Sequence, residues 1–213
     1  MVDTKEILKE KLFAKIEPLQ TRKKGAPLTD KKLDATLVKE IEQLTESLEA
    51  VNPTLSPLLY KPQLLDGAWQ LNYSTAREIR TLDKLPYGFK VGKVYQVIDV
   101  GSQSFLNLAF VKHSLNLLSG YVKVTATFEI AKVDSSPLPD KRINVNFLER
   151  IISIKKIAGF NTPQFDPVKV VPARGPQGRI PSLDITYLDD TMRIGRGGDG
   201  SLFILSKVSA PIP

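Results

Sequence analysis

The spacing of apolar residues changes once along the chain, near Leu65, and this change constrains the fold more than any other feature. Before it, apolar residues recur about every four positions, and after it they alternate with polar residues. A spacing near 3.6 is typical of a helix with one apolar face, whereas a spacing of two is typical of a strand with one buried face. The sequence therefore predicts helices followed by a β-structure.

Two amphipathic helices are predicted in the first part. Asp3 and Glu6 have the spacing of a capping box at the start of the first helix, and Thr29 or Asp30 begins the second. The second helix ends before Pro53, because proline disfavours helical geometry in the residue that precedes it. Each helix has one apolar face that has to be covered, so the pair is either a buttress for the β-part, which we favour, or a lid or docking hairpin. The apolar stripes consist of Leu8, Leu12, Ile16 and Leu19, and of Leu33, Leu37, Ile41, Leu44 and Leu48.

The second part predicts about seven to nine short strands. Clusters of Gly, Pro or Asp separate the alternating runs, at 119–120, 135–139, 189–190 and 195–200. No helical pattern lies between the strands, which favours an antiparallel barrel or sandwich, and a closed barrel leaves no strand edge exposed. The predicted fold is mainly β with N-terminal α. Residues 63–213 form an antiparallel, lipocalin-like β-barrel, and residues 1–62 form a preceding amphipathic helical hairpin with its linker.

The composition argues against catalysis and against a bound metal. The chain has no cysteine and one histidine, His113, so it offers no thiol nucleophile, no thiolate zinc site and no partners for a histidine base. Residues 195–200 match the letters of a dinucleotide-binding loop, but a strand follows them where that site needs a helix N-terminus. We therefore expect a hairpin there, no catalytic residue, no metal site and no cofactor.

The net charge of +7 lies wholly within residues 67–213. Such a surface suits nucleic acid, an anionic membrane or an acidic protein, or is simply solvated. Because the basic residues are scattered and not interleaved with aromatic ones, we expect no nucleic-acid partner. The longest uncharged stretch, 100–111, is far shorter than the roughly 18 apolar residues of a membrane span. The N-terminus has no signal or transit peptide pattern, so we expect either no targeting or a mature form.

The set of residues that says most about function is Trp69 together with two arginines. Trp69 lies in the first strand within a G-x-W motif, and Arg193 and Arg196 lie near the last strand. In a closed barrel the first and last strands are neighbours, so one arginine can stack on the indole, which is worth about 0.5–2 kcal/mol. This arrangement is similar to that of lipocalin-type barrels, whose interiors bind small apolar molecules.

Three blocks of sequence make the resemblance more specific. Residues 65–74 (LDGAWQLNYS), 94–99 (VYQVID), and 182–197 (SLDITYLDDTMRIGRG) with 200–205 (GSLFIL) resemble the fibrillins, the plastid lipid-associated proteins of chloroplasts and cyanobacteria. The resemblance implies a non-enzymatic barrel at thylakoid membranes or plastoglobules. It also implies ligands such as carotenoids, prenylquinones or fatty acids, and roles in their storage or transport or in photoprotection. Since no transit peptide is seen, it implies a cyanobacterial-type member at the cytoplasmic face of the thylakoid, or a processed plastid protein.

Two interpretations of the barrel remain open. In the first, inward-facing side chains bind the lipid, and one arginine either anchors a carboxylate or quinone oxygen or, as we favour, closes structurally on Trp69. In the second, the barrel is filled by its own side chains and is a scaffold that docks on a membrane or on an enzyme of lipid or prenylquinone metabolism. In that case the N-terminal helices are a candidate surface for a protein partner. The ligand-binding candidates are Trp69, Tyr73, Phe110, Phe128, Phe147, Tyr187, Arg193 and Arg196.

Overall fold

A computed structural model describes residues 4–82, 85–131, 140–173, 175, 180–209 and 211. In this part of the chain, eight antiparallel strands form a closed barrel in the order β2-β11-β10-β9-β6-β5-β4-β3, with β3 paired back to β2. The prediction of a lipocalin-like, antiparallel barrel behind N-terminal helices is confirmed. The barrel strands are β2 (Gly67–Ser74), β3 (Phe89–Asp99), β4 (Ser104–His113), β5 (Leu118–Ile130), β6 (Arg142–Ile157), β9 (Ser182–Leu188), β10 (Met192–Gly197) and β11 (Leu202–Val208).

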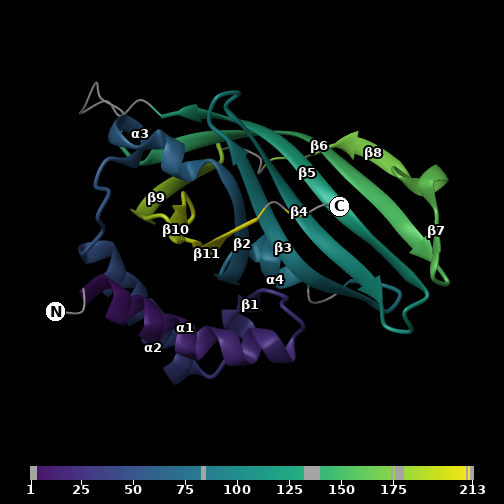
Figure 1. The fold of residues 1–213 in the computed structure, drawn as a ribbon, viewed down its shortest axis with the longest axis horizontal. Helices are drawn as coiled ribbons and strands as arrows, with labels where there is room; N and C mark the ends of the chain where they lie inside the picture. The colour runs from purple at the N-terminus through teal and green to yellow at the C-terminus, as the bar shows by residue number, and fades with distance from the viewer. Residues whose placement is uncertain are drawn as a thin grey trace.

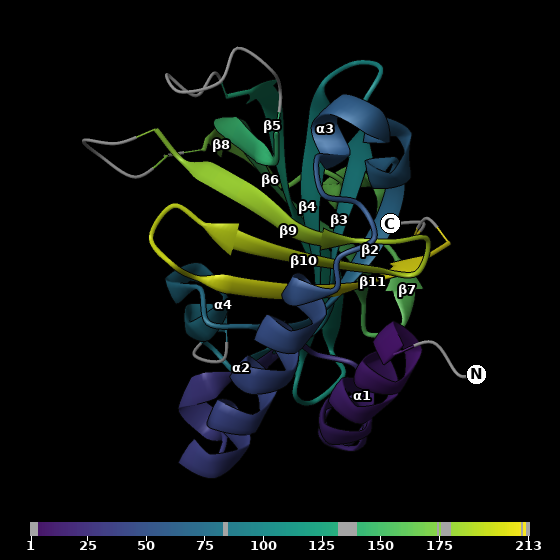
Figure 2. The ribbon, with the colours of Figure 1, turned by 90° about the vertical axis from the view of Figure 1, so that its left-hand side faces the viewer.

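Two long helices precede the barrel, and short elements connect its parts. Figure 2 shows both long helices, α1 and α2, lying together against the side of the barrel made by β10 and β11. The helical and 3-10 segments are α1 (Thr4–Arg22), η1 (Asp30–Lys32), α2 (Ala35–Ala50), α3 (Pro57–Tyr60), η2 (Pro62–Leu65), α4 (Arg77–Thr81) and η4 (Pro163–Phe165). The short strands are β1 (Leu28–Thr29), β7 (Phe160–Asn161) and β8 (Lys169–Pro172).

The helical pair buttresses the barrel, as predicted. Leu12 and Ile16 of α1 and Ile41 and Leu48 of α2 are fully buried in one apolar cluster with barrel residues. The barrel side of this cluster consists of Tyr73, Tyr187, Met192, Ile194, Leu202 and Ile204. Burial of each large aliphatic side chain contributes about 1.5–3 kcal/mol, so this contact, rather than helix propensity, holds the helices in place. The division into domains at residues 62 and 63 stays a prediction.

The second helix begins later than the sequence predicts. Asp34 is its N-cap, and the Asp34 carboxylate accepts hydrogen bonds from the backbone N–H groups of Thr36 (2.8 Å) and Leu37 (3.4 Å). Thr29 does not start the helix, because Leu28 and Thr29 pair in parallel with the end of β2. The predicted start is therefore wrong, since a long-range strand contact outcompetes local helix signals. Asp3, the predicted cap of α1, lies outside the described residues.

Two β-bulges reverse which face of a strand points inward. On β2, Leu71 pairs with Leu205 and Tyr73 with Ile204, so Asn72 is an extra residue. On β9, Ile185 pairs with Gly195 and Tyr187 with Ile194, so Thr186 is an extra residue. An extra residue moves the following side chain to the opposite face. Leu71 and Ile185 therefore lie in the barrel core, whereas Tyr73 and Tyr187 face the helices.

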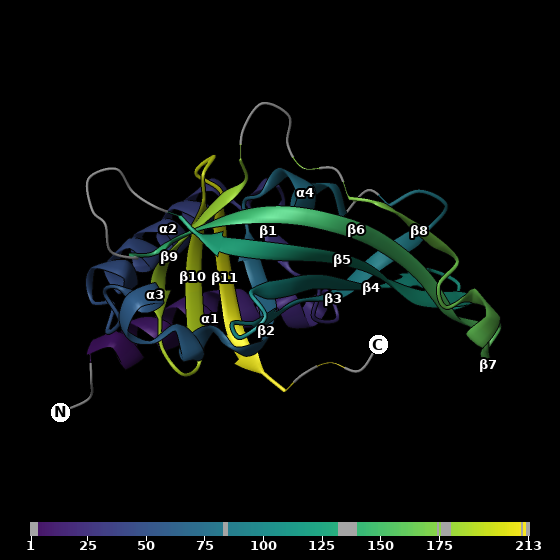
Figure 3. The same ribbon diagram turned by 90° about the horizontal axis from the view of Figure 1, so that it is seen from above.

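Four strands extend well beyond the closed part of the barrel. β3–β6 have 11, 10, 13 and 16 residues, whereas β2 and β9–β11 have six to eight. Their distal parts form a curved sheet, here called the arm, at the right-hand end of Figures 1 and 3. β7 and β8 add to the arm by pairing with β6.

Candidate functional site

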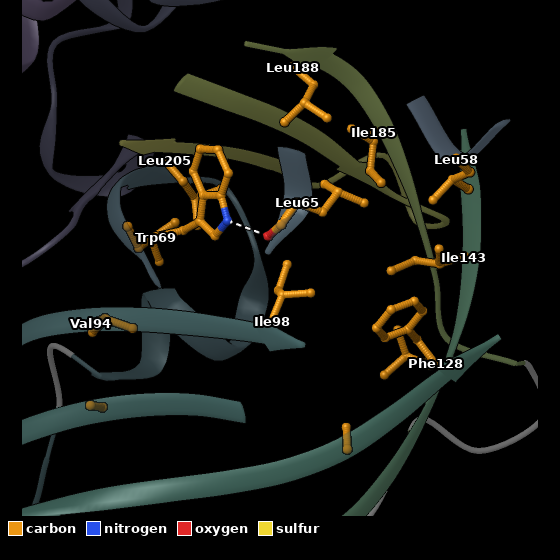
Figure 4. Close-up of a cluster of buried hydrophobic side chains, with 14 residues drawn as sticks. Leu58, Leu65, Trp69, Val94, Ile98, Phe128, Ile143, Ile185, Leu188 and Leu205 are labelled. Carbon is orange, nitrogen blue, oxygen red and sulfur yellow. Dashed lines mark hydrogen bonds between the residues drawn. The ribbon is translucent and has the colours of Figure 1, made fainter. Parts of the chain in front are cut away.

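The interior of the barrel is a densely packed apolar cluster. The cluster includes Leu71, and Figure 4 shows Leu205 next to Trp69, with Phe128 and Ile143 on the opposite wall. Figure 4 shows Leu65 and Ile98 between the two walls. Trp69 is completely buried, and its indole N–H donates a hydrogen bond of 2.8 Å to the carbonyl oxygen of Leu65. The backbone of η2 thus closes this end of the cluster over the indole.

Two cations flank the indole of Trp69. The Arg193 guanidinium carbon lies 5.2 Å from the ring centre and the Lys207 Nζ atom 4.3 Å from it. Both distances are within the range of cation–π attraction. Lys207 also donates to the carbonyl oxygens of Leu64, at 3.1 Å, and Asp66. Arg193, and not Arg196, is therefore the arginine that closes on the tryptophan.

Arg193 is the most unusual residue of the interior. It is 1% exposed, and one Nη atom donates to the side-chain oxygen of Gln96. Its Nε atom has no hydrogen-bond partner, and no carboxylate pairs with the guanidinium within the described residues. Burial lowers the pKa of Arg193 to about 9, and burial together with the charge of Arg193 lowers the pKa of Lys207. A buried cation without a counter-ion is costly, so this group is suited to receive an acceptor oxygen.

A small cavity lies beside Arg193. Its walls are otherwise almost wholly apolar and include Leu65, Ile98, Phe105, Phe128, Leu183 and Ile185. The volume is about 20 Å³, and a water molecule needs about 10–15 Å³ of such space. Arg193 thus lines a small cavity in the interior, but a lipid enters only if aromatic or aliphatic side chains move apart.

The predicted ligand-binding residues do not share one environment. Trp69, Phe128 and Arg193 lie in the barrel interior, and Phe147 packs against it with its ring 6.4 Å from that of Phe105. Tyr73 and Tyr187 instead lie in the cluster beneath the helices, so the expectation that they face inward is wrong. The two bulges described above are the physical reason.

Phe110 also lies outside the barrel interior. Its ring packs at 6.0 Å from that of Tyr95, beside Tyr121 on the outer face of the arm. The inward neighbours on β4 are Phe105 and Ala109. Because residues on both faces of β4 are apolar, the alternation in the sequence does not decide which face is inside. The expectation that Phe110 faces inward is therefore wrong.

Arg196 forms ion pairs with α2 and does not stack on Trp69. Its Nε and Nη2 atoms donate to the two carboxylate oxygens of Glu49 at 2.8 and 2.9 Å, and Nη2 lies 2.7 Å from the Glu42 carboxylate. These bonds raise the pKa of Arg196 further above its ordinary value. Since both glutamates belong to α2, Arg196 fastens that helix to β10.

Two site residues escaped the sequence prediction. Gln96 and Lys207 occupy inward positions, in phase with Ile98 on β3 and with Leu205 on β11. A polar residue at an inward position of an apolar alternation is the signal that identifies such groups. That signal was present in β3, whereas in β11 both faces are apolar and the sequence does not decide which of them is inward.

The other candidate motifs are structural. His113 ends β4 and packs edge-on against Phe89, with ring centres 5.5 Å apart. Residues 195–200 form the predicted hairpin, in which the Gly197 N–H donates to the Ser201 carbonyl oxygen at 2.7 Å. Among the described residues, no group of histidine, aspartate and glutamate side chains has the arrangement of a metal site. None of the helices described here combines the length and the apolar character needed to cross a bilayer.

Comparison with known proteins gives one consistent group of relatives. A family model described as PAP_fibrillin matches residues 6–206. Probable plastid-lipid-associated protein 5 of Arabidopsis thaliana is 31% identical over 199 residues, which cover 93% of this chain and 68% of the relative. Plastid lipid-associated protein 3 of Brassica campestris is 30% identical, covering 79% of this chain and 53% of the relative.

A third relative carries a more specific name. The chromoplast-specific carotenoid-associated protein of Cucumis sativus is 30% identical over 199 residues, covering 79% of this chain and 60% of the relative. The chain thus spans between half and about two thirds of the length of these relatives. No solved structure matches the chain.

Proposed function

Because the chain belongs to the fibrillin family of plastid lipid-associated proteins, we propose that it is a non-enzymatic lipid-binding barrel that takes an oxygen of its ligand against Arg193. The ligand is an apolar molecule with one polar end. The observation that carries this proposal is the buried, unpartnered Nε atom of Arg193 beside an otherwise apolar cavity. A carboxylate or quinone oxygen placed there would accept a hydrogen bond from the unpartnered Nε–H group of the guanidinium.

The chemistry of the walls defines the ligand class. Apolar side chains surround the cavity on most sides, so burial of hydrocarbon or ring surface supplies the affinity, and Arg193 supplies orientation. Fatty acids and prenylquinones have this construction. Carotenoids are a further candidate class because one relative is named a carotenoid-associated protein.

The relatives' names support a proposal for the location. These proteins are named chloroplastic or chromoplastic. We infer a site of action at the thylakoid membrane or at plastoglobules or, in a cyanobacterial-type member, at the cytoplasmic face of the thylakoid. A protein partner on the helices would contact their polar outer faces, because their apolar faces are buried on the barrel.

The cavity volume favours a second candidate function. With about 20 Å³ of free space, the barrel can be a filled scaffold that brings its outer surface to a membrane or to an enzyme of lipid metabolism. The two candidates differ in one measurable property, since a carrier widens its interior around a ligand and a scaffold stays closed.

The test uses the single tryptophan of the chain as a reporter. Trp69 lies in the interior beside Arg193, so a ligand that enters changes its fluorescence. Protein is titrated with a fatty acid, a prenylquinone and a carotenoid, and lipids that copurify from the native cells are identified by mass spectrometry. The carrier predicts saturable quenching that Arg193→Met abolishes and Arg196→Met preserves. A protein that purifies empty and shows no saturable response to any of the three ligands is a scaffold.

A further inference from the structure

The tip of the arm combines exposed apolar side chains with a row of lysines. Here the tip comprises residues 85–88 before β3, residues 114–117 between β4 and β5, and residues 158–161, which are the β6–β7 turn and β7. These segments are joined by hydrogen bonds from Ser114 N to Gly88 O, at 2.9 Å, and from Ala158 N to Leu117 O, at 2.7 Å. The tip lies at the end of the molecule away from α3, as Figures 1 and 3 show.

Large apolar groups stand in solvent at all three segments. Tyr87 is 88% exposed, Leu115 71%, Leu117 50% and Phe160 77%. Single exposed apolar residues are ordinary, but four that come from neighbouring segments form a patch that commonly marks an interaction site. None of the four belongs to a buried cluster, so the fold does not require them.

Three lysines form a line across the strands behind this patch. Lys90 of β3 pairs with Lys112 of β4, Lys112 with Ser119 of β5, and Ser119 with Lys156 of β6. All three lysines are exposed, and none has an ion pair with a described residue. Like charges on directly paired strand positions destabilise a sheet, so this row has no structural benefit for the isolated protein.

The segments that carry and surround the lysine row are strongly basic. The segments 85–98, 104–128 and 151–173 contain seven lysines and one carboxylate, Asp166. That carboxylate is already paired with Lys155 at 2.9 Å and accepts a hydrogen bond from the Tyr121 hydroxyl at 2.6 Å. The lysine row therefore meets an anionic partner without competition from any other carboxylate of the described residues.

We propose that the arm tip docks on a membrane surface that contains anionic lipids. The lysine row contacts the charged headgroups. The exposed apolar side chains of the tip enter the interfacial region, namely Leu115, Leu117, Phe160 and Tyr87. Charged and apolar contacts are combined in this way in many peripheral membrane proteins. An apolar patch at the tip and cations one residue pair behind it match the order of layers at a bilayer surface. The inference rests on the lipid association proposed above, but not on a ligand inside the barrel.

The experiment measures flotation of the full chain with vesicles. Wild-type protein is expected to bind vesicles of phosphatidylglycerol and phosphatidylcholine, to bind phosphatidylcholine alone much more weakly, and to dissociate as salt is raised. Each lysine near an anionic surface is worth a factor of about five in partitioning, so Lys112→Glu with Lys156→Glu lowers binding at least about 20-fold. Lys11→Glu with Lys39→Glu makes the same charge change on exposed positions of α1 and α2 and is the matched control.

A second pair of variants tests the apolar patch. Leu115→Ser with Phe160→Ser is expected to lower binding about tenfold or more, because two large side chains no longer enter the interface. Leu55→Ser with Tyr60→Ser, at positions 78% and 72% exposed near α3, is its control. Equal binding to charged and neutral vesicles, wild-type binding by the arm variants, or equal losses in the controls would each overturn the proposal.

Docking by the arm tip and ligand binding at Arg193 can be tested independently of each other. If the tip is the docking surface, Arg193→Met binds vesicles like the wild type, and Lys112→Glu with Lys156→Glu retains Trp69 quenching by a soluble ligand. Loss of vesicle binding in Arg193→Met with full binding in the arm variants would place docking at the barrel instead. Urea midpoints equal to that of the wild type establish that the exposed substitutions leave the fold intact.

Discussion

The guanidinium of Arg193 lies over the indole of Trp69, 5.2 Å from the ring centre, without a carboxylate to balance it within the described residues. Stacking recovers about 0.5–2 kcal/mol, whereas an unpaired buried charge costs several kcal/mol. An arrangement that reduces stability is consistent with a functional group, and it leads to the first prediction.

Removing the buried charge together with its partner should stabilise the protein. In Arg193→Met with Gln96→Leu, no polar group is left unpaired, so the free energy of unfolding is expected to rise by about 1–3 kcal/mol. Urea denaturation followed by circular dichroism measures this change. A double variant less stable than the wild type would show that the guanidinium is a net structural support.

The Arg196–Glu49 pair should couple α2 to the barrel. The side chains of Arg196 and Glu49 are 26% and 18% exposed, so solvent screens them partly, and the coupling energy is expected to be about 0.5–1.5 kcal/mol. A double-mutant cycle with Arg196→Met and Glu49→Gln measures it. The coupling should fall when salt is raised, and a value of zero would reduce the pair to a surface contact.

The ionised carboxylate of Asp189 should stabilise the fold, and this stabilisation should be lost at acid pH. Burial alone would raise its pKa, but hydrogen bonds from Lys9, Tyr187 and the backbone of Thr191 and Met192 together lower it to about 2. A carboxyl with a depressed pKa stabilises the fold fully above its unfolded value, near 4, and loses that contribution as the pH falls to about 2. The contribution is about 2 kcal/mol.

The measurement compares Asp189→Asn with the wild type in urea from pH 7 to pH 2. The variant should be less stable by a constant amount down to about pH 4, and the difference should disappear towards pH 2. A difference that persists at pH 2 would mean that the charge of Asp189 is not its source.

Gly120 should tolerate no side chain. A Cβ atom there would lie 1.9 Å from the carbonyl oxygen of Ser153, which belongs to the paired strand β6. Backbone cannot give way as a flexible side chain does, so Gly120→Ala should lose at least about 2 kcal/mol of unfolding free energy. Gly92→Ala on β3 is the control, because its Cβ would meet its nearest atom at an ordinary 3.6 Å.

The sequence alone supported more of the fold than of the site. The change of period near Leu65 correctly separated helices from strands, and the position of Trp69 relative to the last strands correctly predicted a stacked arginine. Both inferences depend on regularities that extend over many residues. The docking of the helices also followed, since each has one apolar face that water does not solvate favourably.

It was harder to predict on which face of its strand each side chain lies. Tyr73 and Tyr187 continue perfect alternations in the sequence, yet each follows a bulge that turns it outward. A bulge depends on how two strands pair, and no local pattern in either strand records it. The same holds for Leu28 and Thr29, which pair with β2 instead of starting a helix.

The amino-acid sequence by itself determined the classes of element, their order and the apolar faces, because these follow from local periodicity and from the transfer of apolar groups out of water. Only the tertiary structure decided the register between strands, and with it which arginine lies beside Trp69, which binds α2, and which lysines line up on the arm. Register is set by contacts between residues far apart in the chain. A shift of a single residue reverses every side chain that follows, so the site is a property of the closed barrel and not of any one strand.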